Sequence, residues 1–461
     1  MLALSPDRAG FMKALACVAL IAGLSVGASS LAAEGTRPVV ENGVVAPALQ
    51  GVWRSRGYGW IVRFDAEGPR LYHVAGADCW RDPRPEADPD GVLKLWRPAG
   101  KETVETAGEA DGTRYRFERL KALPKACSDE RPWTPQQTLA AVADAFAAYY
   151  PLSAERGFDW TARRREAFAA LGPARDEAAL WKALGVLLRG ISDPHVQLDG
   201  VIVGEPRSRR FGEAPVLLSA QGRAGGEAAW RKAWRDGVLA APFHARQVAN
   251  GRIFWGRDGE VGYLAIVSMG GFDPAAGDDD TVALDAVLDE AMTAFSGASA
   301  VIVDVSNNRG GYDTISRRIA ARFAAGRVVV GSKIPTGVAG PSQDLFVEPS
   351  DRPRYLGPVW LLTSRITVSA GETFTLMMRG LPNVRQVGEA TRGALSDQVP
   401  MPLPNGWRFA LPAEIHRDAE GQVVEGVGIA PQVPLSVHPP DDPGDGHARA
   451  LARLLEMIRA R

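Results

Sequence analysis

The second half of the chain alternates short apolar runs with amphipathic stretches. Runs suited to strands buried on both faces lie at 261–268, 298–305, 359–363 and 384–388. Stretches with apolar residues at helical spacing lie between them at 280–295, 314–324 and 369–380. Buried strands joined by helices predict an α/β layer architecture with a largely parallel core sheet.

The first half has two other patterns. From Gly51 to about Leu120, aromatic and β-branched residues alternate with polar ones between Gly, Asp and Pro, which predicts a small antiparallel β domain. Three helices are then expected at 139–150, 159–171 and 176–188, with Thr134 as the N-cap of the first. They end in the loop 190–195, where Pro194 disfavours helix. Later, Asn405-Gly406 between alternating segments predicts a hairpin over 398–411.

These patterns divide the chain into five parts. We expect a signal peptide at 1–33, a small β domain at 34–130, a helical lead-in at 131–200 that ends in the His195 loop, an α/β core at 201–438, and a linker with a C-terminal helix at 439–461.

The N-terminus has the layout of a secretory signal. Arg8 and Lys13 precede an apolar run from Ala14 to Gly27, and small residues follow up to Ala32 and Ala33. The alternative is an uncleaved membrane anchor, although the run is short for a bilayer span. No later segment is apolar for about 18 residues, so no stable membrane insertion is expected after cleavage. The predicted location is periplasmic or secreted.

Two cysteines follow the predicted signal, Cys79 and Cys127. An even pair in an exported chain indicates a disulfide within the β domain, and the alternative is two buried free thiols. Neither CxxC pairs nor an HExxH motif occur, so no metal is expected. The 53 basic and 54 acidic residues are well mixed and give a net charge of −1, which argues against a nucleic-acid partner.

Three features could carry chemistry. Ser369 follows a buried strand and opens a helix, where it is either a plain N-cap or a nucleophile beside the positive helix start. The paired glycines Gly310 and Gly311 follow another buried strand and form either an ordinary turn or an oxyanion hole. His195 lies in a polar loop, and histidine is the side chain that best accepts a serine proton near neutral pH.

Together these segments resemble the C-terminal-processing (tail-specific) and tricorn-core serine peptidases over about residues 134–438. The similar segments are Gly262–Ile266, Asp304–Gly311, Val368–Glu372, Gly388–Gly393, Pro404–Trp407 and Glu425–Pro431, with Tyr149–Pro151, Asp159-Trp160 and Asp193–His195 resembling the tricorn-like lead-in. The resemblance implies a crotonase/ClpP-like core sheet with helices, a polypeptide substrate and no cofactor. Many relatives carry a PDZ domain before the core, whereas the stretch between Gly200 and Val261 is too short for one.

The resemblance also implies roles for single residues. Ser369 would attack the acyl carbonyl, and the amides of Gly310 (or Gly311) and Ala370 would hold the oxyanion. One branch of the family uses a lysine base in a Gly-Lys-Gly-like stretch, but here that position is Arg392, which stays protonated.

The base is therefore expected to be His195, as in the tricorn-like branch. Pro194 departs from that branch, which has serine before the histidine. Glu425 or Asp193 would orient the imidazole. The predicted function is an exported serine peptidase. The alternatives are a catalytically inactive peptide- or envelope-binding scaffold, and an esterase or amidase with the same nucleophile.

Overall fold

The structure, a computed structural model, describes residues 35–460 apart from 87, 89–90, 129–132, 222–224, 277–279 and 440–444. The predicted signal peptide lies outside the described residues. Within the described part of the chain, no helix combines the length and apolar character that a bilayer crossing requires.

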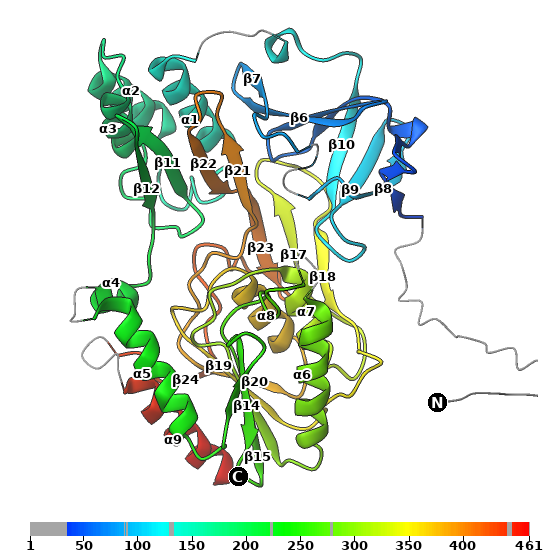
Figure 1. The fold of residues 1–461 in the computed structure, drawn as a ribbon, viewed down its shortest axis with the longest axis vertical. Helices are drawn as coiled ribbons and strands as arrows, with labels where there is room; N and C mark the ends of the chain where they lie inside the picture. Colours follow the sequence, from blue (N-terminus) through cyan, green and yellow to red (C-terminus); the bar gives the residue numbers. More distant parts are fainter. Residues whose placement is uncertain are drawn as a thin grey trace, which may run out of the picture.

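A seven-stranded sheet forms the centre of the C-terminal half (Figure 1). Its order is β13 (Arg246–Val248), β14 (Ile253–Arg257), β15 (Val261–Ile266), β16 (Ala300–Asp304), β19 (Val359–Thr363), β20 (Val384–Gly388) and β24 (Val433–Pro434). The strands from β15 to β24 pair in parallel, whereas β13 and β14 add an antiparallel edge. The predicted parallel core is therefore present.

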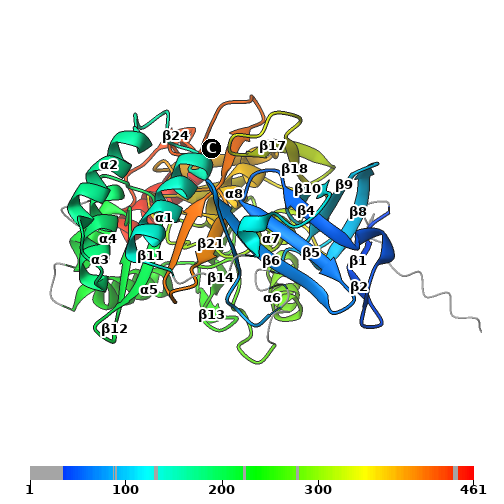
Figure 2. The ribbon, with the colours of Figure 1, turned by 90° about the horizontal axis from the view of Figure 1, so that it is seen from above.

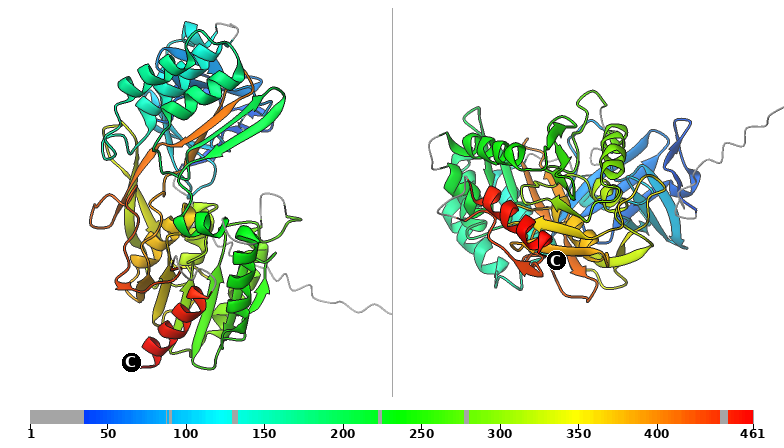
Figure 3. Two further views of the ribbon diagram at one scale, coloured as in Figure 1. Left: turned by 90° about the vertical axis from the view of Figure 1, so that its left-hand side faces the viewer. Right: turned by 90° about the horizontal axis from the view of Figure 1, so that it is seen from below.

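Helices cover both faces of this sheet, as the two views in Figure 3 show. One layer is α6 (Thr281–Ala294), α7 (Asp313–Ala320) and α8 (Ala370–Arg379); the other is α5 (Gly226–Ala240) and α9 (Gly446–Arg459). Successive strand residues point to opposite layers, so Leu361 packs towards the first layer and Leu362 towards the second. This explains why the central strands β15, β16 and β19 are almost entirely apolar.

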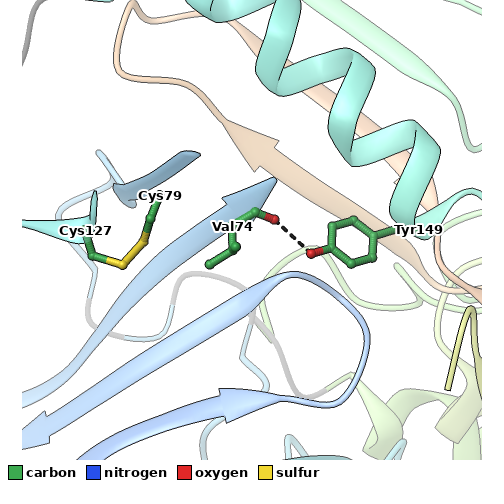
Figure 4. Close-up of a disulfide and its surroundings, with 4 residues drawn as sticks. All are labelled: Val74, Cys79, Cys127 and Tyr149. Carbon is green, nitrogen blue, oxygen red and sulfur yellow. Dashed lines mark hydrogen bonds between the residues drawn. A yellow bond between two sulfur atoms is a disulfide. The ribbon is translucent and has the colours of Figure 1, made fainter. Parts of the chain in front are cut away.

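The N-terminal part is an antiparallel sheet of eight strands. In order across the sheet they are β1 (Arg37–Pro38), β8 (Leu95–Gly100), β9 (Thr103–Ala107), β10 (Tyr115–Leu120), β4 (Gly51–Ser55), β5 (Trp60–Asp65), β6 (Gly68–Ala75) and β7 (Asp78–Arg81). Beside it, β2 (Val40–Glu41) pairs with β3 (Val44–Val45). The predicted disulfide is confirmed: Cys79 on β7 is bonded to Cys127 (Figure 4).

The helical lead-in consists of α1 (Pro135–Tyr149), α2 (Trp160–Leu171) and α3 (Glu177–Leu187), close to their predicted bounds. Thr134 caps α1 as predicted, since its side chain accepts a hydrogen bond from the Gln137 amide. The lead-in lies beside the β domain (Figure 2). The Tyr149 hydroxyl joins the two by donating to the Val74 carbonyl at 3.0 Å (Figure 4).

One four-stranded sheet links the lead-in to the core. Its order is β12 (Glu205–Arg210), β11 (Gln197–Ile202), β22 (Arg408–Pro412) and β21 (Gln398–Pro402). The hairpin of β21 and β22 confirms the turn predicted at Asn405-Gly406. Because β11 begins two residues after His195 and pairs with β22, the hairpin brings the histidine loop to the core.

The expected fold class is confirmed: an α/β core sheet with helices, preceded by a helical segment and an antiparallel β sheet. Several elements were not predicted, among them the antiparallel pairs β11–β12 and β13–β14. A three-stranded sheet of β18 (Gln343–Val347), β17 (Val328–Pro335) and β23 (Glu414–Asp418) lies beside the core, and α4 (Pro215–Gln221) and α5 occupy the Arg/Gly/Ala-rich stretch after Gly200. The helix predicted at 314–324 ends earlier, at Ala320.

Candidate active site

Ser369 is the residue that precedes α8, and its backbone is left-handed. Its φ is +58° and its ψ is −130°, in a region that non-glycine residues occupy at a cost of about 1–3 kcal/mol. The loop after β20 and the first turn of α8 hold it there: its amide donates to the Ala394 carbonyl at 2.9 Å, and its carbonyl accepts from the Glu372 amide at 2.7 Å. A strained serine between a buried strand and a helix is typical of a nucleophile position.

Glu372, one turn into α8, fixes the segment opposite Ser369. Its buried carboxylate accepts from the amides of Gly393 (2.6 Å) and Ala394 (2.7 Å), and from that of Ser369 at 3.3 Å. Burial raises the pKa of Glu372 to about 7, although these hydrogen bonds oppose the shift. One side chain thus ties the nucleophile turn to the loop after β20.

The loop after β16 lies against Ser369. The Asn308 side chain holds it, with Oδ1 accepting from the Gly310 amide at 2.8 Å and Nδ2 donating to the Ile266 carbonyl at 2.9 Å. Among the described residues, the amides of Gly311 and Ala370 donate to no protein acceptor. Of the predicted oxyanion donors, Gly310 is thus already engaged, whereas Gly311 and Ala370 are available.

His195 and Ser369 line the same cavity, of about 310 Å³. None of the other five histidines is among the residues described as lining it. Burial lowers the pKa of His195, and the carboxylates of Asp193 and Asp397 oppose this shift. The imidazole is therefore neutral near pH 7, which is the state that a general base needs.

The two carboxylates predicted to orient His195 bind backbone amides instead. Asp193 Oδ1 accepts from the amide of His195 at 3.0 Å, and Glu425 accepts from the amides of Leu395 (3.2 Å) and Ser396 (3.0 Å). The Nδ1 atom of His195 is buried and has no hydrogen-bond partner among the described residues. Asp193 thus positions the histidine loop rather than the ring.

Arg392, at the position of the lysine in the other branch, joins the two halves of the site. Its guanidinium donates to the Gly212 carbonyl at 2.5 and 3.0 Å, and to the Ser192 hydroxyl at 3.2 Å. Its amide donates to Thr367, two residues before Ser369. Sequence patterns could exclude Arg392 as a base but did not indicate this clamping role, which depends on residues about 180–200 positions away.

Gln398 is a second contact that the sequence did not indicate. Its side-chain amide donates to the His195 carbonyl at 2.9 Å. Because Gln398 begins β21, the hairpin holds the histidine loop by a side-chain hydrogen bond as well as by strand pairing.

Comparison with known proteins identifies a family for the region around Ser369. The family model for peptidase family S41 matches residues 260–435. These residues form a peptidase family S41 domain. The S41 domain contains Ser369, both glycines, Ala370 and Glu425, whereas Asp193 and His195 lie before it. This domain is therefore that of a serine-type peptidase. No relative was found among curated proteins.

Solved structures share the fold well beyond the S41 domain. A putative peptidase from Parabacteroides merdae is 23% identical, with a TM-score of 0.57 over 71% of this chain and 97% of that one. Mature CPAF is 13% identical, with a TM-score of 0.52 over 71% of this chain and 98% of that one. Mature CPAF complexed with lactacystin is 12% identical, with a TM-score of 0.50 over 71% of this chain and 99% of that one. At these identities the likeness concerns the fold alone.

Proposed function

We propose that this protein is an exported serine peptidase that hydrolyses peptide bonds through an acyl-enzyme on Ser369. The observation that carries the proposal is that Ser369, held in a left-handed conformation at the start of α8, shares one cavity with a neutral, buried His195. A candidate nucleophile and a candidate base, 174 positions apart in the sequence, thus line one cavity beside the start of α8. The S41 domain around Ser369 supports the same chemistry.

In this mechanism the His195 imidazole takes the proton of the Ser369 hydroxyl while the oxygen attacks the peptide carbonyl carbon. The open amides of Gly311 and Ala370 donate to the resulting oxyanion, next to the positive end of α8. The C–N bond then breaks, and imidazolium gives its proton to the leaving amine. A water molecule, deprotonated by the same imidazole, hydrolyses the ester and restores Ser369.

The nearby carboxylates act indirectly. Asp193 holds the histidine loop through the His195 amide, and its charge stabilises the imidazolium together with that of Asp397. Glu425 holds the segment that follows Arg392 through the amides of Leu395 and Ser396. Both are positioning residues in this proposal.

Two features support export. The first 33 residues have the layout of a signal peptide, and Cys79–Cys127 is a disulfide of the kind that persists in oxidising compartments. These two features are the basis on which we propose a periplasmic or secreted location. Carboxy-terminal processing is the form of peptidase activity that the motif resemblance favours.

Covalent labelling tests the proposal. A fluorophosphonate probe should add to Ser369 of the parent protein, as located by peptide mass spectrometry, and should not add to Ser369→Ala. Circular dichroism of the variant should match that of the parent. Equal labelling of both proteins would exclude Ser369 as the nucleophile, and an unlabelled parent would favour the inactive scaffold. Hydrolysis of ester but not peptide libraries would favour an esterase.

A further inference from the structure

The cavity that contains Ser369 and His195 is rich in arginine. Four arginines line it: Arg210 at the end of β12, Arg309 after β16, Arg365 after β19 and Arg392 after β20. Glu213 is the one carboxylate among the lining residues described. The formal excess is therefore three positive charges. The chain as a whole has a net charge of −1, so this excess belongs to the cavity and not to the protein surface in general.

Local carboxylates offset the charge of two of these arginines. The guanidinium of Arg309 lies 3.1 Å from Glu227, which it shares with Arg231. The guanidinium of Arg392 binds a neutral carbonyl and a neutral hydroxyl, and the carboxylates of Asp193 and Glu372 act on its charge from nearby. The side chains of Arg210 and Arg365 have no ion-pair partner among the described residues.

Position makes this charge relevant to catalysis. A peptide that acylates Ser369 must place the residues on either side of its scissile bond within or at the rim of this cavity. Arg365 and Arg210 are exposed there, one on the nucleophile side and one on the histidine side. Guanidinium groups bind carboxylates through paired, charge-assisted hydrogen bonds, whereas they repel lysine and arginine side chains.

We propose that the cavity selects acidic polypeptides, with Asp or Glu flanking the scissile bond, and that Arg365 and Arg210 bind the carboxylates of these residues. The inference rests on the proposed function, since it names the substrate class of the same site. A hydrogen bond to a charged group changes affinity by about 10- to 100-fold, which sets the selectivity expected per acidic residue.

The test uses quenched fluorescent peptides of one scaffold, acetylated and amidated so that no terminal charge contributes. Their flanking residues are acidic (Asp, Glu), neutral (Asn, Gln) or basic (Lys, Arg). The parent protein should show kcat/KM about 10- to 100-fold higher for acidic than for neutral peptides, and lowest for basic ones. Raising the salt concentration from 50 mM to 500 mM should narrow the difference.

Charge reversal assigns the effect to residues. Arg365→Glu and Arg210→Glu should each lower kcat/KM for acidic peptides about 10-fold or more and raise it for basic ones. Arg207→Glu is the matched control, because Arg207 is also exposed on β12 but does not line the cavity, and it should retain the parental preference. Should a reversed variant lose its cooperative melting transition, Arg365→Gln and Arg210→Gln replace it, with the acidic preference again expected to fall.

Fluorophosphonate labelling separates the two proposals. If Ser369 is labelled and peptides are hydrolysed but acidic and neutral peptides are cleaved equally, the acidic selectivity is wrong while the peptidase function stands. Equal losses for all three peptide classes in the reversed variants would likewise overturn it. If the parent is neither labelled nor active, the proposed function itself fails.

Discussion

The α-carbon of Gly310 lies so close to Ser369 that a Cβ added to it would be 2.7 Å from the Ser369 Cβ and 3.0 Å from the Val368 carbonyl oxygen. The φ of Gly310 is also +84°, which side chains disfavour. The loop after β16 and the turn that carries Ser369 therefore pack tightly against each other at Gly310. A side chain at this position would not fit without a shift of Ser369 or Val368.

Substitution of Gly310 should consequently impair catalysis. We expect Gly310→Ala to lower kcat/KM by about 100-fold or more, because the added methyl group displaces Ser369 from its attack position. Gly326→Ala is a suitable control, since an added Cβ there meets no atom within 4 Å. Steady-state kinetics on both variants, with melting curves, check this. Parental kinetics in Gly310→Ala would mean that the contact does not position the nucleophile.

The buried His195 predicts activity that extends into mildly acidic solution. Burial lowers its pKa below the ordinary value of 6.5, and activity requires the neutral ring. kcat/KM should therefore rise with pH through a midpoint below 6.5 and then level off, and His195→Ala should reduce kcat by about 10²- to 10⁴-fold. A midpoint above 7 in the pH–rate profile would argue against His195 as the base.

Asp193→Asn tests whether the charge of Asp193 sets the midpoint of the pH–rate profile. The carboxylate of Asp193 raises the pKa of His195, so its neutralisation should move the midpoint to lower pH, while the amide oxygen still accepts the His195 N–H. Asp199→Asn, on β11 beyond the loop, should leave the midpoint unchanged. A shift in the opposite direction would show that Asp193 does not act through its charge.

A buried lysine joins the β domain to the core. The Lys333 ammonium on β17 donates to Thr113 (2.7 Å), Asp397 (3.1 Å) and Glu414 (3.2 Å), and these carboxylates hold its pKa above the usual value despite burial. Lys333→Met leaves the buried carboxylate of Glu414 and the partly exposed one of Asp397 without their cation, and should cost about 3–5 kcal/mol in the free energy of unfolding, measured by urea denaturation.

A matched lysine provides the control for that measurement. Lys232→Met on the exposed face of α5 removes a solvent-exposed ion pair with Asp236, and should leave the urea midpoint where it is in the parent. Similar midpoints for Lys333→Met and the parent would show that the carboxylates take up protons at little cost.

The disulfide should contribute strongly to stability. Cys79 and Cys127 are 48 positions apart, and closing a loop of this length in the unfolded chain corresponds to about 4 kcal/mol. The double variant Cys79→Ala/Cys127→Ala should be destabilised by about that amount in urea. Dithiothreitol should lower the stability of the parent and leave that of the double variant unchanged. If dithiothreitol also destabilised the double variant, its effect on the parent would not come from reduction of this disulfide.

Much of the core could be predicted because its signals are local. The apolar strands and the helix that starts at Ser369 follow from hydrophobic periodicity, and the hairpin follows from Asn405-Gly406. The helix α5 was missed although Trp230, Trp234 and Val238 follow helical spacing and are all buried. Its many charged residues concealed that pattern.

The missed sheet and contacts depend on distant parts of the chain. Lys333, Glu414 and His416 occupy strand positions where polar residues indicate exposure, yet all three are buried. Lys333 and Glu414 are satisfied by each other and by Thr113 and Tyr58 of the β domain, whereas neither ring nitrogen of His416 has a hydrogen-bond partner among the described residues. The clamp from Arg392 to Gly212 and the amide partners of Glu425 likewise follow from tertiary structure alone.

The pairing of β11 with β22 has a consequence for biogenesis. Residues 197–199 meet 408–410 of the same polypeptide, so the histidine loop acquires its support only when the chain has been made almost to its end. A nascent or partly translocated chain would hold both reacting side chains and still be inert. Proteolytic competence would thus arise late, after the polypeptide has left the synthetic machinery.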